Sequence, residues 1–568
     1  MCGIIGSVGK LNHFENIFNG LKRLEYRGYD SSGVSYLLDK KLSLVKVTSS
    51  IDELKEKVKS FNSLNAIGHT RWATHGKISI ENAHPFLSMN HIFSLAHNGT
   101  IDNFLEIKKE LLENGYVFKG ETDSEVIVNY LEFLYLSGNE ILDCLKILDQ
   151  KLLGSYSLVI ITNKNSNLYF LKNQTGLLIS KEKNGYLISS DLYAFNHKNI
   201  SYLELDDHQY GLINKKECKV FSDSKMVKTN FKNITIELED LNQINCFLEK
   251  EIDECPEVVK EELNYYLKDN QINISQDIID HLKNASKITV IGCGTSYHAG
   301  LTFKKFNPNL NIEVKYASEF IYEEGIFQKD DVFIVLSQSG ETLDIIKSIE
   351  KVKSYYILSI TNNKDSKIAR SASVNLDIKA KKEISVASTK AYFCEVIMLY
   401  LLSAKINKHD MDDVYLLVDD LKMVLSRKKE IELIAKEISK YRSLYFLGKG
   451  IDYDAALECS LKLKEITYIH SETITIGELK HGPLALVNDN FPSIFIFSQP
   501  SLEKTINIAK SEIKSRNGKI FEFKLERYHS LSFLPQVLFG DLLSLYVGRF
   551  LKVNIDKPRN LAKSVTVE

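Results

Sequence analysis

The 568-residue sequence lacks several features that mark particular classes of protein. Its eight cysteines include no C-x-x-C pair, and no cysteine–histidine cluster has the spacing of a zinc site. Positive and negative charges nearly cancel, with 72 Lys and Arg against 74 Asp and Glu, so no overall electrostatic argument favours nucleic acid or anionic membranes as partners. No apolar run is long enough to span a bilayer, and no secretory signal region is expected. Scattered cysteines suit a reducing compartment, so we expect a cytoplasmic protein.

The length predicts three or four structural units. Over the first 240 or so residues, short apolar runs alternate with Asn, Gly and Asp, and helical patterns interrupt them, which indicates an α+β domain. The expected helices lie at 12–25, 104–114 and 124–136, and two of the expected strands lie at 157–162 and 168–171. Residues 241–280 are interpreted as a linker with a helical lead-in.

From residue 281 onward, apolar strands alternate with helices, which predicts βαβ units and a parallel sheet. The pattern Gly292-Cys293-Gly294 after one strand is echoed by Gly448-Lys449-Gly450, and Ser337-Gln338 is echoed by Ser498-Gln499. Two duplicated doubly wound α/β subdomains explain these echoes, and chance is the alternative. The predicted domains are 1–240, the 241–280 lead-in, subdomains at 281–425 and 426–558, and a C-terminal tail at 559–568.

A cysteine directly after the initiator methionine is the first chemical candidate. If Met1 is removed, the free α-amine of Cys2 can act as general base for its own thiol. Elsewhere in this region, Arg71 could clamp an α-carboxylate, Asn98-Gly99 could stabilise an oxyanion, and Asp123 could pair with an ammonium group. Each of these has an ordinary alternative, namely a surface arginine, a turn and a helix cap.

Together these residues resemble the class II, N-terminal nucleophile, glutamine amidotransferase domain. The resemblance runs from Cys2 to about Asp240 and rests on 2–6, 25–31, 69–76, 82–85, 97–99 and 122–123. It implies that Cys2 forms a thioester with glutamine and releases ammonia, with Asn98 and Gly99 as the oxyanion hole. It also implies that glutamine is held by Arg71, Thr74, His75 and Asp123, and that Trp72, the one tryptophan of the chain, gates an ammonia channel. Residues 172–177 depart from the family pattern.

The second candidate site consists of two turns between strands and helices. Ser337-Gln338-Ser339-Gly340-Glu341-Thr342 and Cys293-Gly294-Thr295-Ser296 both offer hydroxyl and N–H donors at a helix start, a combination that suits a phosphate group. Helix capping by Ser and Thr is the alternative. Lys462 and Glu465 are spaced to share one helix face, but the pattern alone assigns no role to them, to His481 or to Lys563.

This half of the chain resembles the tandem sugar isomerase (SIS) domains of the glutamine–fructose-6-phosphate aminotransferase (isomerizing) family. The resemblance rests on 293–296, 337–342, 386–390, 462–465, 477–483 and 558–568. It implies transfer of ammonia from L-glutamine to D-fructose 6-phosphate to give D-glucosamine 6-phosphate, the first step of hexosamine synthesis, by a homodimer without cofactor or metal.

The same resemblance implies a role for each matching residue. The sugar phosphate is bound by Ser337, Gln338, Ser339 and Thr342, and the sugar is contacted by Ser296, Val386 and Ser388. His481 assists ring opening from the neighbouring subunit, and Lys563 forms a Schiff base with the open-chain ketose. Glu465 moves the proton between C1 and C2, with Lys462 beside it.

Three alternatives remain open at this point. A deglycase or another sugar-phosphate aminotransferase or isomerase needs the phosphate turns but not Cys2. A non-enzymatic sugar-phosphate sensor could lose Glu465, His481 and Lys563, all of which are present here. An amidophosphoribosyltransferase shares the first domain, but its second half carries an acidic diphosphate-binding loop, and no such loop is found here.

Overall fold

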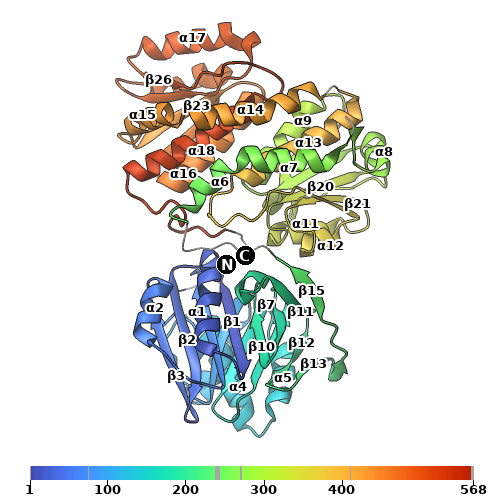
Figure 1. Cartoon of the computed structure of the whole chain (residues 1–568), viewed down its shortest axis with the longest axis vertical. Helices are drawn as coiled ribbons and strands as arrows, with labels where there is room; N and C mark the ends of the chain where they lie inside the picture. The colour runs from blue at the N-terminus through green and yellow to red at the C-terminus, as the bar shows by residue number, and fades with distance from the viewer. Residues whose placement is uncertain (1, 74–75, 237–243, 269–270, 410, 564–568) are drawn as a thin grey trace. The chain divides into compact units, whose positions relative to one another are not determined.

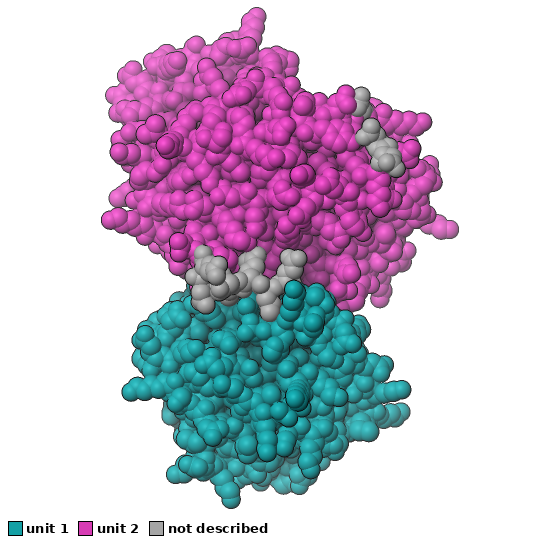
Figure 2. Space-filling model, in the orientation of Figure 1, with its two compact units in different colours: residues 1–241, 565–568 teal, residues 242–564 magenta. Residues whose placement is uncertain are grey.

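The computed structural model describes residues 2–73, 76–236, 244–268, 271–409 and 411–563. The chain forms two compact units, unit 1 spanning Met1–Leu241 and unit 2 spanning Asn242–Ser564 (Figures 1 and 2). Among the described residues, no helix is both long and apolar enough to cross a membrane.

Unit 1 contains two antiparallel sheets. The first has the strand order β15 (Lys232–Thr235), β11 (Asn199–Glu204), β9 (Leu178–Glu182), β10 (Gly185–Ser189), β1 (Gly3–Gly9), β4 (Asn65–Arg71), β2 (Ser31–Leu38) and β3 (Lys41–Val47). The second has the order β14 (Lys225–Val227), β13 (Cys218–Ser222), β12 (Gln209–Ile213), β8 (Leu168–Asn173), β7 (Gly154–Thr162), β6 (Phe93–Ile101) and β5 (Phe86–Leu87).

Alternation of side chains along the strands explains how these sheets are layered. On β1, Ile4 packs into the core between the two sheets, whereas Ile5 faces the opposite way into a core shared with helix α1 (His13–Leu24) and helix α2 (Ile51–Val58). The outer face of the second sheet is covered by α3 (Phe104–Glu113), α4 (Asp123–Leu136) and α5 (Ile141–Lys151). Unit 1 therefore has helices outside two facing sheets, the predicted α+β arrangement.

Unit 2 contains two parallel sheets. The five-stranded sheet has the order β19 (Ile312–Tyr316), β18 (Ile288–Gly292), β20 (Val332–Ser337), β21 (Tyr356–Thr361) and β22 (Val374–Asp377). The four-stranded sheet has the order β24 (His470–Thr475), β23 (Ser443–Gly448), β25 (Pro492–Phe495) and β26 (Lys519–Glu522). Both sheets begin with the order 2-1-3-4 along the chain, so the predicted duplication of a doubly wound subdomain is confirmed.

The helices of unit 2 supply its core. They are α6 (Phe247–Asp253), α7 (Cys255–Tyr266), α8 (Gln276–Asn284), α9 (Thr295–Phe306), α10 (Ala317–Phe320), α11 (Leu343–Lys351), α12 (Lys367–Ser371), α13 (Lys390–Asn407), α14 (Asp412–Ser426), α15 (Lys428–Ile438), α16 (Ile451–Thr467), α17 (Glu503–Lys514) and α18 (Phe533–Phe550). Helices α13 and α18 are buried on nearly every face, which explains why neither shows an amphipathic pattern in the sequence.

Most of the predicted elements are found within one or two residues of their expected ends. The helix expected at 12–25 is α1, whose N-cap residue Asn12 accepts a hydrogen bond from the Glu15 N–H over 3.2 Å. In the second subdomain, β25 begins at Pro492 and ends at Phe495, so Ser498 lies beyond the strand, whereas Ser337 is the last residue of β20.

Candidate functional site

The Cys2 thiol lies where the start of β1 meets the end of β4. Antiparallel pairing sets Gly3 opposite Thr70, which brings Cys2 beside the backbone of Trp72. The Sγ accepts a hydrogen bond from the Trp72 N–H at 3.4 Å and lies 3.5 Å from the Trp72 carbonyl oxygen. Burial raises the pKa of the Cys2 thiol, while the Trp72 N–H and the Arg71 charge oppose that rise. The geometry therefore favours a neutral thiol that needs a general base.

Asn98, on β6 of the facing sheet, reaches the same place. Its Nδ2 donates a hydrogen bond to the Cys2 carbonyl oxygen at 3.1 Å, and its Oδ1 lies 3.1 Å from the Nε2 of His69. Gly99 follows with φ of +119°, and a Cβ there would lie 1.9 Å from the Ser155 carbonyl oxygen. Only glycine fits that position without strain. The structure therefore joins Cys2 to Asn98 by a hydrogen bond, and Gly99 is the next residue along β6.

Asp123 and Arg71 occupy the ends of a helix and a strand in the same unit. Asp123 is the first residue of α4, and its Oδ2 accepts the Ile101 N–H at 3.0 Å. Arg71 is the last residue of β4 and is buried, and Gly28 packs against it so closely that a Cβ would lie 2.7 Å from the Arg71 carbonyl carbon. Trp72 is half-buried. Thr74 and His75 lie outside the described residues.

In unit 2, the two predicted phosphate turns follow neighbouring strands, β18 and β20. Along the chain, β18 is the first strand of this sheet and β20 the third, and in the sheet they lie side by side. The order of the strands reverses direction at this point, which is where ligands bind in such folds. In the second turn, the Ser337 Oγ lies 3.1 Å from the Thr342 Oγ1 and accepts the Gly340 N–H at 3.1 Å. The Ser339 Oγ accepts the Glu341 N–H at 3.2 Å.

Donors in this turn remain available for an anion. Thr342 is the N-cap residue of α11, but its side chain accepts no hydrogen bond from the N–H groups of that helix. Helix capping therefore does not explain why a threonine stands at this position. Gly340 has φ of +70°, and a Cβ there would lie 2.0 Å from the Ser366 Oγ. Gln338 and Ser339 are partly exposed beside it. The turn combines hydroxyl donors with a helix start, the arrangement expected of a phosphate site.

Lys462 links the predicted acid–base residue Glu465 to the first turn. Its Nζ lies 2.5 Å from Glu465 Oε1, 3.2 Å from Glu458 Oε1 and 3.0 Å from the Thr295 hydroxyl. Burial alone would lower the pKa of Lys462, but the two carboxylates raise it above its ordinary value. Burial raises the pKa of Glu465, and Lys462 opposes that rise. Lys462 is therefore a fixed cation, and Glu465 is the more readily protonated carboxylate.

Glu458 is held by three donors and is not positioned for proton transfer. Its oxygens receive the Thr295 hydroxyl at 3.0 Å and the His298 Nδ1 at 2.7 Å, besides Lys462. Burial would raise the pKa of Glu458, but Lys462 and His298 lower it. In the same turn, Ser296 donates to Glu395 Oε1 at 2.8 Å.

Lys563, from the C-terminal tail, reaches the same subdomain. Its Nζ donates to Glu383 Oε2 at 2.7 Å, and both side chains are buried. Glu383 also accepts the Ser388 hydroxyl at 2.8 Å and the backbone N–H groups of Thr389 and Ala391 at 3.0 Å. Burial would raise the pKa of Glu383, but Lys563 and these N–H groups lower it to about 2. Glu383 is thus an anion that joins two predicted site residues.

Two further predicted residues, Val386 and His481, make no side-chain hydrogen bond to the groups described above in the described part of the chain. Val386 is buried, and its N–H donates to the Asp556 carbonyl oxygen at 3.0 Å, so the segment just before the C-terminal tail holds this loop. His481 ends a 3₁₀ turn at Ile476–His481 and is exposed in the single chain. No hydrogen bond or ion pair joins His481 to the other predicted residues in the described part of the chain, and the expectation that it acts from a neighbouring subunit remains a prediction.

The second subdomain contains equivalent turns, but there the carboxylate of Asp452 binds the donors of the turn. Asp452 stands two residues after Gly450, as Ser296 does after Gly294. Its carboxylate accepts the Ser498 N–H at 3.1 Å, the Ser498 hydroxyl, and the Gln499 amide at 3.1 Å. The donors that would hold a phosphate are therefore satisfied internally, which leaves the first subdomain as the candidate sugar-phosphate site.

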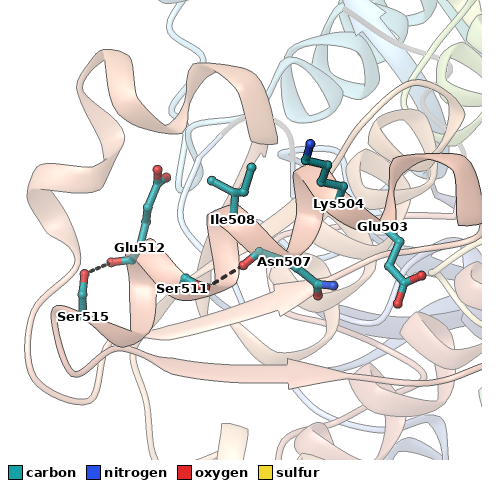
Figure 3. A pocket seen from close by; sticks show the side chains of 7 residues that line it. All are labelled: Glu503, Lys504, Asn507, Ile508, Ser511, Glu512 and Ser515. Atoms are coloured by element: carbon teal, nitrogen blue, oxygen red, sulfur yellow. Dashed lines mark hydrogen bonds between the residues drawn. The ribbon is translucent and has the colours of Figure 1, made fainter.

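A surface hollow of about 710 Å³ lies elsewhere, on the outer face of α17 (Figure 3). It is lined by Glu503, Lys504, Asn507, Ile508, Ser511, Glu512 and Ser515. These residues come from one helix and its end, and none belongs to either predicted site. The hollow is therefore separate from both predicted sites.

The sequence did not reveal the residues that support these sites. Glu383 lies 180 residues from Lys563 and Glu395 lies 99 residues from Ser296, so no local spacing could have found these pairs. Glu458 lies one helical turn before Lys462, a spacing that could have indicated their contact. His69 and His97 fall within stretches that carry the family resemblance, yet their roles depend on contacts between two sheets.

Comparisons with known proteins agree with this division of the chain. A model of the glutamine amidotransferase domain matches residues 69–197, and a model of the SIS domain matches residues 281–405 and 437–523. Proteins named glutamine–fructose-6-phosphate aminotransferase (isomerizing) from Oceanobacillus iheyensis and Caldanaerobacter subterraneus are 35% and 36% identical to the chain, with all of each chain covered. Among solved structures, the C-terminal domain of glucosamine-fructose-6-phosphate aminotransferase from Francisella tularensis is 30% identical, with a TM-score of 0.52, and covers 56% of this chain and 99% of its own.

Proposed function

The chain belongs to the family of glutamine–fructose-6-phosphate aminotransferases (isomerizing), and from that premise we propose that it moves the amide nitrogen of L-glutamine onto D-fructose 6-phosphate. The products are D-glucosamine 6-phosphate and L-glutamate, and the reaction begins hexosamine synthesis. The observation that supports the proposal is that predicted residues of both half-reactions lie together in one chain. Cys2 and Asn98 meet in unit 1, while Lys563 and the phosphate turn share the first subdomain of unit 2.

In the first half-reaction, the Cys2 thiolate attacks the glutamine amide carbon, ammonia leaves, and water hydrolyses the thioester to glutamate. Removal of Met1 would free the α-amine that takes the thiol proton, in keeping with the raised pKa of Cys2. Asn98 Nδ2 and the Gly99 N–H stabilise the oxyanion. Arg71 and Asp123, with Thr74 and His75, hold the α-carboxylate and α-ammonium of glutamine.

In the second half-reaction, the sugar phosphate binds at the turn that contains Ser337, Gln338, Ser339 and Thr342. Ser296, Val386 and Ser388 contact the sugar. Lys563 adds to C2 of the open-chain ketose, and loss of water gives a Schiff base, which ammonia then replaces. Glu465 removes the C1 proton and returns it at C2, because an adjacent imine makes that proton far more acidic. Lys462 neutralises the charge that develops there.

The finer parts of the proposal concern assembly and location. His481 is exposed in the single chain and is assigned to ring opening in a neighbouring subunit, which makes a homodimer part of the proposal. Trp72 follows the glutamine clamp Arg71 and is assigned to gating ammonia. A cytoplasmic location is proposed because all eight cysteines are free thiols.

The proposal is tested by incubating the purified chain with glutamine and fructose 6-phosphate and quantifying glutamate and glucosamine 6-phosphate. We expect both products from the wild type, neither from Cys2→Ala, and glutamate alone from Lys563→Ala. Amino sugar made from glutamine by Cys2→Ala would refute the nucleophile. Undiminished amino sugar synthesis by Lys563→Ala would refute the Schiff base.

A further inference from the structure

Three buried histidines pack together behind the Cys2 site of unit 1. The rings of His69 and His84 stack with centroids 4.1 Å apart, and the His84 and His97 centroids are 6.4 Å apart. All three side chains are buried, and burial lowers the pKa of each, that of His69 to about 3. No group of metal-ligand geometry is found among the described residues, so the cluster needs another explanation.

The hydrogen bonds of His69 determine its tautomer. Its Nε2 lies 3.0 Å from the His97 carbonyl oxygen and 3.1 Å from the Asn98 Oδ1. Both of these atoms only accept hydrogen bonds, so the proton of the neutral ring is on Nε2. The Nδ1 of His69 is buried and has no partner in the described part of the chain. Protonating it would create a buried N–H without an acceptor, which costs more than leaving a lone pair unpaired.

The same bond determines the orientation of the Asn98 amide. Because Oδ1 accepts from His69, the NH₂ group must point the other way, toward Cys2, where one N–H donates to the Cys2 carbonyl oxygen. The second N–H of that NH₂ group is left to serve a developing oxyanion. A flipped amide would set Oδ1 against the Cys2 carbonyl oxygen and remove this donor.

The remaining two histidines connect this arrangement to Asp123. Ser124 Oγ lies 2.8 Å from His84 Nε2 and 2.9 Å from His97 Nδ1, and it donates to Asp123 Oδ1 at 3.2 Å. Since the hydroxyl has one proton and gives it to Asp123, both histidines donate to Ser124. The unpaired nitrogens of His84 and His97 are then lone pairs, as in His69.

We propose that His69 is a positioning residue for the glutamine half-reaction, holding the Asn98 side chain with its NH₂ group toward Cys2. The inference rests on the proposed roles of Cys2 and Asn98. In the described part of the chain, the hydrogen bonds of His69 go to the His97 carbonyl oxygen and to Asn98, not to the Cys2 thiol, so His69 acts through the orientation of Asn98.

The test compares His69→Leu and His69→Gln with His13→Leu in the full-length chain. His13 is a matched control because it is a buried histidine of the same unit, bonded to Ser7 Oγ at 2.7 Å and to the Gly9 carbonyl oxygen at 3.1 Å, without a link to Asn98. For each variant, glutaminase kcat and KM, thermal unfolding, and the rate of Cys2 alkylation by iodoacetamide are measured. Alkylation displaces iodide at carbon and forms no oxyanion, so it reports on the thiol alone.

We expect His69→Leu to lower glutaminase kcat about 10- to 100-fold relative to His13→Leu, with little change in KM and with Cys2 alkylation within about twofold. His69→Gln, whose amide can donate to Asn98, should recover part of the loss. The inference is overturned if His69→Leu and His13→Leu have the same kcat, or if kcat and alkylation fall together. Glutaminase activity that survives in Cys2→Ala would refute the nucleophile itself, and with it this inference.

Discussion

At the scale of single residues, Glu383 is a buried carboxylate paired with Lys563, the amine proposed to form the Schiff base. It is fully shielded from water, yet it accepts hydrogen bonds from Lys563, Ser388 and two backbone N–H groups. The same carboxylate would stabilise the positive charge of a protonated Schiff base on Lys563, because that charge forms on the same nitrogen. Glu383 would therefore support both the resting amine and the proposed covalent intermediate.

Replacing Glu383 with Gln should lower amino sugar synthesis at least about 10-fold while leaving glutamine hydrolysis unchanged, because the two sites lie in different units. Synthesis and hydrolysis are measured separately on the same preparation. Glu254→Gln is the control, since Glu254 pairs with the buried Lys390 at 2.6 Å in the same unit. Equal losses of synthesis in the two variants would mean that Glu383 contributes only to stability.

At the scale of elements, the pairing of β6 with β7 determines which residue can follow Asn98. Gly99 pairs with Tyr156, and the close approach of the Ser155 carbonyl oxygen leaves no space for a side chain. The strand pair thus holds a backbone conformation that would be strained in any other residue.

Gly99→Ala should destabilise unit 1 by at least about 2 kcal/mol more than Gly115→Ala and should abolish glutaminase activity. Both glycines have positive φ, +119° and +83°, but a Cβ at Gly115 meets no atom within 4 Å. The comparison therefore separates steric overlap from backbone strain. Equal unfolding free energies by chemical denaturation would contradict the account.

The sequence predicted the elements better than the contacts between them. Parallel strands followed by Ser- and Gly-rich turns predicted the site at β18 and β20, because neighbouring strand ends must meet at one sheet edge. The partnership of Lys563 with Glu383 could not be predicted, since 180 residues separate them and no periodicity links them.

At the scale of the whole molecule, unit 2 contains buried carboxyl groups whose pKa is raised by desolvation, so that they stay protonated near neutral pH. Desolvation raises the pKa of Glu395 to about 8 and that of Glu251 to about 8, from an ordinary value of 4.5. A carboxyl group with a raised folded-state pKa stabilises the fold below its unfolded pKa, and that contribution is lost as pH rises toward the folded pKa. Unit 2 should therefore lose stability between about pH 4.5 and pH 8.

Glu395→Gln should flatten this dependence, because the amide cannot ionise and its oxygen can still accept the Ser296 hydroxyl. We expect the unfolding free energy of the wild type to fall by about 2 kcal/mol more than that of the variant between pH 6 and pH 8. Denaturant titrations at several pH values measure the difference. Parallel curves for the two proteins would show that Glu395 is already ionised in the fold.

The central claim is that one chain passes nitrogen from glutamine to a sugar phosphate. The most direct test supplies glutamine labelled with ¹⁵N in its amide group, together with fructose 6-phosphate and unlabelled ammonium, and determines the isotope in the product by mass spectrometry. We expect glucosamine 6-phosphate that carries ¹⁵N despite the unlabelled ammonium. Absence of an aminated sugar, or an amino sugar without ¹⁵N, would contradict it.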